Sequence, residues 1–417
     1  MKLLFRIILF AAVFIAPFHG QNSSAQQVNK KRVEGQFKQW LAKDLYPKAA
    51  ANGVSRQSFN KALSGVTINW KLPDLVPPGS SANKPRKQTQ AEFRAPSRYF
   101  AKNTVDGVVV GGKNRLARHK DLLNRLEKKT GVPGRTVVAI WGRESAFGNA
   151  KIPHNAFQVL ATKAFMSTRR ELFERELLAA LVMVEKGTSA KLMKSSWAGA
   201  LGQPQFLPSS YLKYAADGDG NGKADIWNSE ADTLASIANY LAANGWVAGR
   251  DWGFEVKVPA SVSCALEGPD NGRPIAEWQA MGIERTSGRP FPANEINEEG
   301  FLMMPAGRFG PAFIVTPNFY VLKAYNESDL YALFIGHAGD RMAFNSAPFN
   351  AGWGKTDKML RSDIAKFQRH LESLGHDVGG ADGLPGFKTR RSIGKWQETK
   401  GIKSTCFPSN TLVRSVK

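Results

Sequence analysis

Glu144 is the acidic residue whose place in the sequence best suits proton transfer. It lies in the segment Gly134–Gly148, GRTVVAIWGRESAFG, whose apolar residues are spaced as on one face of a helix. Glu144 follows Ile140 by four residues and Trp141 by three, so it projects from that apolar face. Burial and the negative end of the helix dipole both raise a carboxyl pKa, as a general acid near neutral pH requires. On this segment alone, the favoured interpretation is still a structural glutamate that reaches solvent or pairs with a neighbouring arginine.

A second segment, Ser195–Ser209 (SSWAGALGQPQFLPS), combines small residues with neutral hydrogen-bonding side chains. Ser196, Gln203 and Gln205 offer hydroxyl and amide groups beside the aromatic rings of Trp197 and Phe206. Uncharged polar groups next to aromatic rings are a common way to hold a sugar. A tightly packed turn between helices is compatible with the same pattern.

The segment from Asp217, DGDGNGKAD, has the spacing of the start of a calcium-binding loop. Its oxygen-bearing residues at loop positions 1, 3, 5 and 9 are Asp217, Asp219, Asn221 and Asp225. Position 12, usually a glutamate, is an asparagine here, and Asp232 or Glu230 could replace it. We therefore expect a weak or purely structural calcium site, with a simple Asp/Gly/Asn turn as the alternative.

The charge of the 417-residue chain and its first residues predict its compartment. The chain has 57 Lys and Arg against 35 Asp and Glu, a net charge of +22, which favours a polyanionic partner. Residues 1–25 have the basic start, the apolar run and the small-residue site of a secretory signal peptide. We therefore expect an exported, soluble, periplasmic protein whose polyanion is a cell-wall or membrane-surface polymer rather than nucleic acid.

Several classes of protein are excluded by missing motifs. The sequence has no HExxH and no histidine–cysteine cluster, which argues against a zinc enzyme. SxxK and KTG matches occur in the wrong order for a penicillin-binding enzyme. No phosphate-binding glycine loop or dinucleotide fingerprint is present. The two cysteines, Cys264 and Cys406, are too few for a disulfide scaffold, and a bond between them and a free pair remain equally open.

The elements that must position these residues are mainly helical. Periodic apolar residues predict helices within 32–63, over 114–129 and from a capping box at Thr168 to Gly187, while 71–96 and the stretch from Gly148 to Ala164 are expected to be irregular. Alternating residues predict short strands near 254–259, 302–304 and 313–315. Beyond residue 356, three short helices are expected in a unit of about sixty residues.

Five segments together resemble glycoside hydrolase family 103, the lytic murein transglycosylase B family. They are WGRESAFG, SSWAGALGQPQFLPSSYLKYA, DGDGNGKADIW, ANYLAANGW and PNFYVLKAYNES, and the likeness covers most of 36–342. The last sixty residues resemble a peptidoglycan-binding domain through Phe367-Gln368, Asp382-Gly383, Thr389-Arg390 and Trp396-Gln397. Two departures stand out: Ser145 replaces the family's usual threonine, and Pro204 lies between the two glutamines.

The resemblance implies a fold and a division of the chain. We expect a mainly α (α+β) protein with a lysozyme-like helical catalytic domain, a small β-sheet region and a three-helix C-terminal domain. The expected parts are a signal peptide (1–25), a lytic transglycosylase catalytic domain (26–346), a linker (347–356) and a peptidoglycan-binding domain (357–417).

The resemblance also implies an activity and its residues. The enzyme would cleave the β-1,4 bond between N-acetylmuramic acid and N-acetylglucosamine, with Glu144 as its only catalytic carboxylate. Ser196, Gln205 and Asn326 match positions that line the sugar cleft, and Arg169 and Arg170 match a pair near the peptide-bearing sugar. No cofactor is required, a structural calcium ion is expected at the loop, and peptidoglycan is the implied partner of a monomer, together with other wall-remodelling proteins.

A single carboxylate suffices if the substrate supplies the nucleophile. Ordinary glycosidases need a second carboxylate as nucleophile or base. In a lytic transglycosylase, Glu144 would first protonate the glycosidic oxygen and then take the proton of the muramyl C6 hydroxyl, which closes a 1,6-anhydro ring. Two alternatives remain: a hydrolytic muramidase that uses Asp217 or Asp225, and a non-catalytic wall-binding protein.

Overall fold

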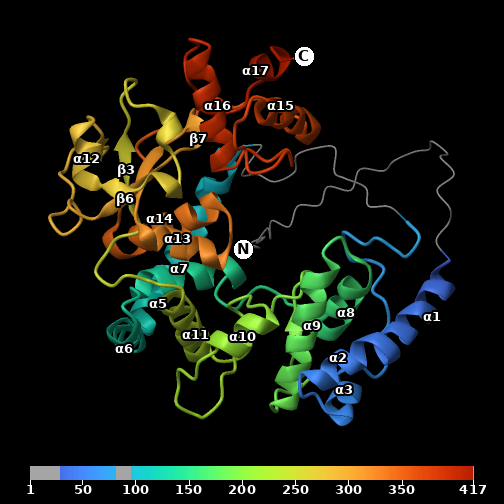
Figure 1. Ribbon diagram of the computed structural model, residues 1–417. Helices are drawn as coiled ribbons and strands as arrows, with labels where there is room; N and C mark the ends of the chain where they lie inside the picture. The colour runs from blue at the N-terminus through green and yellow to red at the C-terminus, as the bar shows by residue number, and fades with distance from the viewer. Residues whose placement is uncertain (1–28, 81–94, 417) are drawn as a thin grey trace, which may run out of the picture. The chain divides into compact units, whose positions relative to one another are not determined.

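The computed structural model describes residues 29–80 and 95–416, and the expected signal peptide lies outside them. The chain forms two compact units, each built from segments distant in sequence (Figure 1). Of the described residues, unit 1 contains 29–80, 145–213 and 226–228, and unit 2 contains 95–144, 214–225 and 229–416. None of the helices within the described residues is long and apolar enough to cross a membrane.

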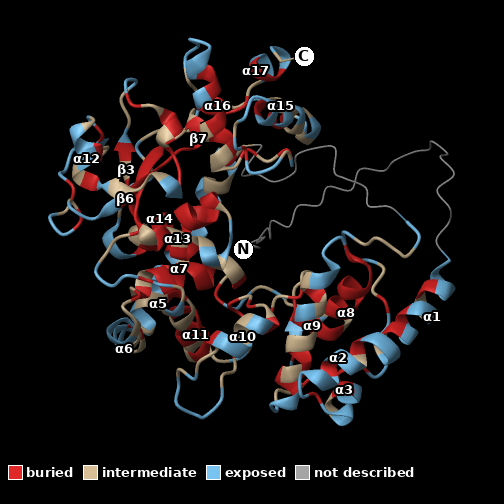
Figure 2. Cartoon of the chain, viewed as in Figure 1, coloured by how far each residue is buried: buried red, intermediate tan, exposed pale blue. Residues whose placement is uncertain are grey.

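Unit 1 is a small helical assembly. Its helices are α1 (Lys30–Trp40), α2 (Tyr46–Ala51), α3 (Arg56–Leu63), α8 (Ala156–Met166), α9 (Arg170–Glu185) and α10 (Pro208–Tyr214, whose last residue belongs to unit 2), with a π-helical turn at Leu41–Leu45. Helix α8 forms the centre, because each of its residues except Gln158 is buried, and α9 packs along it (Figure 2). Strands β1 (His154–Asn155) and β2 (Lys194–Ser195) pair antiparallel beside α8.

Unit 2 holds the remaining helices and the larger sheet. Its helices are α5 (Lys102–Arg118), α6 (Lys120–Thr130), α7 (Gly134–Ser145, whose last residue belongs to unit 1), α11 (Glu230–Ala243), α12 (Ile275–Ala280), α13 (Pro317–Tyr325), α14 (Asp329–Phe344), α15 (Arg361–Ser373), α16 (Phe387–Thr399) and α17 (Asn410–Arg414), with a 3-10 turn at Pro96–Phe100. Helix α14 is almost wholly buried from Asp329 to Gly339 and packs against α5 and α13. It is therefore the central helix of this unit.

The sheet of unit 2 has the strand order β4-β6-β8-β3-β5, and every neighbouring pair is antiparallel. The strands are β3 (Gly253–Lys257), β4 (Arg273–Pro274), β5 (Glu284–Arg285), β6 (Glu299–Met303) and β8 (Ala312–Val315), and β7 (Pro305–Arg308) lies between β6 and β8 in sequence. Gly253 faces Val315 across the β3–β8 pair, and Phe301 faces the same valine from β6. The sheet covers a core that includes Trp278, Ile314 and both cysteines.

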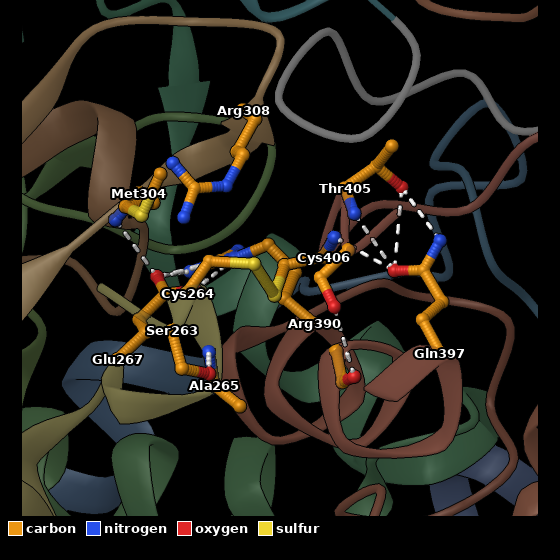
Figure 3. The surroundings of a disulfide bond; sticks show 12 residues. Ser263, Cys264, Ala265, Glu267, Met304, Arg308, Arg390, Gln397, Thr405 and Cys406 are labelled. Carbon is orange, nitrogen blue, oxygen red and sulfur yellow. Dashed lines mark hydrogen bonds and ion pairs between the residues drawn. A yellow bond between two sulfur atoms is a disulfide. The ribbon is translucent and has the colours of Figure 1, made fainter. Parts of the chain in front are cut away.

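The C-terminal helices have a core of their own, built from Phe367, Leu371, Ile393, Trp396 and other apolar residues of 367–413. A disulfide bond joins Cys264, in a 3-10 turn (Cys264–Leu266) of the sheet region, to Cys406 after α16 (Figure 3). The two cysteines, left open by the sequence, are therefore paired. Helix α16 also packs against the turn that contains Cys264.

The predicted elements are confirmed for the most part, with three differences. The helix expected over 114–129 is divided at His119, whose ring bonds the Glu230 carboxylate at 2.8 Å and packs on Trp141. The stretch up to Ala164, expected to be irregular, contains α8, whose nearly continuous burial removes the helical periodicity. Helix α9 begins after Arg169 without a side-chain cap, so the capping box at Thr168 is wrong.

Candidate active site

Helix α7 carries Glu144 to its last turn, as the sequence predicts. Its residues Val137, Val138, Ile140 and Trp141 are fully buried, which fixes the helix in the core of unit 2. Glu144 itself keeps partial exposure. A helix held by such a core gives a side chain near its end little freedom, so the carboxyl has a defined position.

The chain leaves α7 through a strained turn. Ala146 and Phe147 have φ values of 49° and 59°, in the left-handed region that non-glycine residues rarely adopt, and Gly148 follows at 78°. The Ser145 hydroxyl accepts a hydrogen bond from the Gly148 N–H at 3.0 Å. Serine thus supplies the hydroxyl that the family's threonine would supply. Strain of this kind is concentrated at functional sites.

The pKa of Glu144 is raised above the ordinary range of a glutamate. The largest cause is desolvation, because protein atoms surround the carboxyl closely although the residue is not wholly buried. The Tyr331 hydroxyl and the Arg143 guanidinium oppose this effect. The tyrosine lies near the carboxyl without meeting strict hydrogen-bond geometry. A carboxyl with a raised pKa can carry a proton near neutral pH and donate it.

Arg143, the neighbour of Glu144, is held by aromatic rings. Its guanidinium lies 4.7 Å from the centre of the Tyr99 ring and 4.8 Å from that of Phe334. Cation–π contacts of this kind hold the charge beside the rings. Arg143 therefore lowers the pKa of Glu144 but does not outweigh desolvation.

Tyrosine rings surround the carboxyl within unit 2. Tyr325, at the end of α13, and Tyr331, in the first turn of α14, stack with their ring centres 6.3 Å apart. Tyr240 of α11 packs edge-on against Tyr325 at 4.8 Å and against Tyr214 at 4.7 Å. Burial first and the Glu144 charge second raise the pKa of Tyr325 and Tyr331 well above 10, so both hydroxyls stay protonated donors.

The sequence did not predict Tyr240 and Tyr331 as site residues. The spacing could have revealed them, because Tyr325 and Tyr331 flank a short turn in PNFYVLKAYNESDLY, and Tyr240 lies in ANYLAANGW. The predicted Asn326 is exposed directly after Tyr325, and its side-chain oxygen accepts a hydrogen bond from the Ser328 N–H at 3.3 Å. Asn326 and Glu144 therefore lie in the same unit.

The other predicted substrate-binding residues belong to unit 1. The Ser196 hydroxyl accepts from the N–H groups of Ala198 and Ala200, and Gln205, with φ 54°, donates its amide to the Gly202 carbonyl at 2.8 Å. Both residues thus shape the same loop. Arg169 and Arg170 are exposed at the start of α9.

The predicted calcium loop brings three carboxylates together. Oxygens of Asp217, Asp219 and Asp232 all lie within 4.8 Å of one another, and Asp232 is fully buried at the start of α11. Asp225 does not join this group among the described residues; its N–H donates to Asp232. Asn221 uses its side-chain oxygen to accept from the Lys223 N–H.

The donor set fits a hard divalent cation. Backbone N–H groups, that of Gly222 first, hold the pKa of Asp217 below its usual range, so that carboxylate stays charged. Carboxylates this close repel one another when charged, unless a cation lies between them. Oxygen ligands of this kind suit calcium, and the Asp232 carboxylate lies close enough to Asp217 and Asp219 to replace the glutamate usual at position 12 of such a loop.

A desolvated acid at a helix end, close to tyrosine rings, is typical of a helical carbohydrate-cleaving enzyme. The model of the transglycosylase SLT domain family matches residues 36–340. The chain is 30% identical over 301 residues to membrane-bound lytic murein transglycosylase B of Escherichia coli strain K12. The aligned residues cover 70% of this chain and 79% of that protein. The chain therefore belongs to the transglycosylase SLT domain family and is a lytic murein transglycosylase.

Solved structures agree with this assignment. SltB3 of Pseudomonas aeruginosa, crystallised in complex with NAG-anhNAM-pentapeptide, is 37% identical with a TM-score of 0.81, and the match covers 91% of this chain and 99% of that one. The Escherichia coli lytic transglycosylase Slt35 in complex with calcium is 26% identical with a TM-score of 0.56, over 76% of this chain and 94% of that one. The mainly helical fold with a small sheet is thus confirmed.

Proposed function

We propose that this chain cleaves the β-1,4 bond between N-acetylmuramic acid and N-acetylglucosamine in peptidoglycan, and that Glu144 is the only carboxylate that takes part. The observation that carries this proposal is the setting of Glu144. Its raised pKa is opposed by a tyrosine and an arginine, and no other carboxylate contributes to the shift among the described residues. A hydrolase with two carboxylates would place the second one near the first.

The proposed reaction uses Glu144 twice. Protonated Glu144 donates to the glycosidic oxygen as its bond to the muramyl C1 breaks, which releases the N-acetylglucosamine hydroxyl. The resulting carboxylate then takes the proton of the muramyl C6 hydroxyl, and that oxygen bonds to C1. Glu144 is protonated again at the end of the reaction, and no water is consumed.

The tyrosines suit both steps. Because Tyr325 and Tyr331 remain protonated, each can donate a hydrogen bond to the Glu144 carboxylate that forms after the first proton transfer. The Tyr325 ring, which is partly exposed, offers an apolar face against which a sugar can pack, while Tyr331 is buried behind it. The two rings are parallel within 8°, which supports a fixed arrangement.

Further residues are proposed to hold the substrate. Ser196, Gln205 and Asn326 would bind sugar hydroxyl and acetamido groups, and Arg169 and Arg170 would meet the carboxylates of a peptide stem. The exposure of both arginines at the start of α9 supports this role. The relatives' structures with NAG-NAM-pentapeptide and NAG-anhNAM-pentapeptide support a peptide-bearing substrate.

A structural calcium ion is proposed for the loop at Asp217. Asp217, Asp219 and Asp232 would hold it, and the calcium complex of Slt35 supports this assignment. The bound cation would neutralise their mutual repulsion. No step of the reaction involves it.

The predicted location and domain plan are also part of the proposal. The enzyme would be exported to the periplasm by residues 1–25, act as a monomer alongside other wall-remodelling proteins, and bind peptidoglycan through 357–417 beyond a linker at 347–356. The separate apolar core of 367–413 supports a distinct C-terminal unit.

Mass spectrometry of digested, purified peptidoglycan tests the proposal. Lytic transglycosylase action yields 1,6-anhydromuramyl ends, which are lighter by one water molecule than the reducing ends that a hydrolase yields. Reducing ends would identify a hydrolytic muramidase and overturn the single-carboxylate mechanism. An absence of cleavage would leave only a wall-binding role.

A further inference from the structure

We infer that Arg390, from the C-terminal unit, is a positioning residue for the catalytic turn, which we define as residues 325–331 between α13 and α14. This inference rests on the proposed function of Glu144. It assigns to a residue outside the family match at 36–340 a part in supporting the active site. Arg390 does not touch the reacting groups; it acts through Asp329.

The catalytic turn connects the two tyrosines that face Glu144. Tyr325 ends α13, and Tyr331 lies in the first turn of α14, where the Ser328 hydroxyl accepts its N–H at 3.1 Å. Asp329 is the first residue of α14, in the same helical turn as Tyr331. A shift of Asp329 therefore moves the Tyr331 hydroxyl relative to the Glu144 carboxyl.

Two cations hold Asp329 from different sides. Lys323 of α13 lies 2.6 Å from one carboxylate oxygen, and Arg390 of α16 donates to the other at 3.0 Å. The lysine joins the two ends of the catalytic turn. The arginine ties that turn to the C-terminal unit. Although burial raises the pKa of Asp329, the two cations together lower it below the ordinary value, so the carboxylate stays charged.

Arg390 is itself fixed on every side. Its side chain is 2% exposed, and its guanidinium donates to both oxygens of the fully buried Glu267 and to the Pro385 carbonyl. Glu267 also accepts from the Met304 N–H of the sheet region (Figure 3). A guanidinium provides several donors in a rigid fork, and here the fork spans two carboxylates. A lysine cannot reproduce that geometry.

The disulfide bond holds α16 where Arg390 needs it. Cys264 precedes Glu267 by three residues, so the bond to Cys406 anchors the carboxylate that receives the arginine (Figure 3). The Gln397 side chain of α16 accepts from the N–H groups of Thr405 and Cys406. A side-chain carbon on Gly394 would lie 2.3 Å from the Cys406 sulfur, which shows how closely α16 packs here. The C-terminal unit is thus attached firmly enough to position Asp329.

The test compares Glu267→Gln with the double variant Glu267→Gln/Arg390→Met. The single variant keeps the contact between Arg390 and Asp329. The double variant removes it without leaving a buried carboxylate unpaired, because Lys323 still pairs with Asp329. Arg391→Met is the matched control on α16, since Arg391 pairs with the exposed Asp270 and not with Asp329.

Steady-state kinetics on short, soluble, uncross-linked glycan strands provide the readout, below the unfolding temperature of every variant. We expect the double variant to lose kcat by about tenfold to a hundredfold, as misplaced catalytic groups do. KM and adsorption to isolated sacculi should stay unchanged, and Arg391→Met should keep the kcat of the wild type. Glu267→Gln, which keeps the contact between Arg390 and Asp329, should lose less kcat than the double variant. A folded double variant with the kcat of Glu267→Gln would overturn the inference.

Failure of the double variant to fold and failure of the proposed function are separate outcomes. If the double variant does not fold, Arg390→Lys is tested in its place, because lysine keeps the buried charge but lacks the forked guanidinium. A fall in kcat would then support the inference, and an unchanged kcat would overturn it. If the wild-type enzyme releases no 1,6-anhydro ends from the same strands, the proposed function fails independently of Arg390.

Discussion

Glu144 and Asp329 are two carboxylates of unit 2 with opposite protonation behaviour. Burial is the largest influence on both and raises the pKa of each. Around Asp329, Lys323 and Arg390 reverse the effect and lower its pKa. Around Glu144, the nearby cation is Arg143, whose guanidinium lies against Tyr99 and Phe334 and lowers the pKa too little to reverse the shift.

The difference shows how one unit makes a proton donor and a structural anion from similar side chains. Desolvation alone yields a carboxyl that keeps its proton, and desolvation with two direct ion pairs yields a permanent charge. The catalytic turn joins both, because Tyr331 and Asp329 lie in one helical turn. One helical turn therefore contains both Asp329, which stabilises the fold, and Tyr331, which takes part in the proposed chemistry.

Replacing the proton donor should give the largest effect. We expect Glu144→Gln to reduce turnover by about 10²- to 10⁴-fold, since the amide cannot donate a proton to the leaving oxygen. Release of 1,6-anhydro ends measures turnover, and adsorption to sacculi should be unchanged. Glu277→Gln, an exposed glutamate on α12, is the control and should keep full activity. Near-normal turnover of Glu144→Gln would remove this residue from the mechanism.

Stability should respond in opposite directions at the two carboxylates. Asp329→Asn should lower the free energy of unfolding by about 1–3 kcal/mol at neutral pH, because it removes the charged acceptor shared by Lys323 and by the buried Arg390, which keeps Glu267 as its partner. The folded pKa of Asp329 is lowered, so its contribution exists above the unfolded pKa and disappears as pH falls through the folded one. The difference between this variant and wild type should therefore shrink in acid.

Glu144→Gln should instead raise Tm by about 1–3 °C at neutral pH. The folded pKa of Glu144 is raised, so its stabilising contribution is complete below the unfolded pKa and is lost as pH rises through the folded one. The gain of the variant should vanish in acid. Thermal unfolding of both variants between pH 2 and 8 provides the measurement, and two curves of the same sign would contradict the comparison.

Removing the disulfide bond should weaken the packing that keeps Asp329 in its ion pairs. Reduction, or Cys264→Ser/Cys406→Ser, should lower the free energy of unfolding by about 2–5 kcal/mol, because the bond joins residues 142 apart in sequence. Denaturant titration with and without reductant measures this loss. The chain has no other cysteine, so reductant should have no effect on the double serine variant.

The carboxylates of Asp217, Asp219 and Asp232 provide a third case, because within the described residues none of them forms an ion pair with a lysine or arginine. If calcium is bound, chelation should lower stability by about 1–3 kcal/mol, the effect of a ligand near 10 to 100 times its Kd. Thermal unfolding with calcium and with chelator measures the shift. Asp217→Asn/Asp232→Asn should be insensitive to calcium, whereas a wild-type Tm that ignores calcium would remove the ion from the proposal.

The sequence predicted the parts of the fold that rest on local periodicity. Helix α7, the three central strands and the C-terminal helices follow from apolar spacing and turn residues. Helix α8 was missed because a helix buried on all sides has no polar face, and the break at His119 depends on contacts with Glu230 and Trp141. Tertiary contacts, not local propensity, determine both.

Prediction of the site residues from the sequence has the same limit. The apolar face and helix end indicated a raised pKa for Glu144, and the loop spacing indicated the cluster of Asp217 with Asp219 and Asp232. The sequence could not reveal that Arg390 reaches Asp329, because 61 residues separate them and an arginine in a C-terminal helix is ordinarily solvated. Nor could it pair the two cysteines, since their approach depends on the packing of α16.

Cys406 has a consequence for the order in which the protein matures. It belongs to the sheet core of Phe254, Trp278 and Ile314, although it is synthesised 142 residues after Cys264. Such non-local contacts form late in folding, because the entropy of closing a long loop must be lost before the contacts can stabilise the fold. The sheet core therefore cannot be completed before the segment of Cys406 is present, and a chain that ends before Cys406 lacks part of the core of the sheet region.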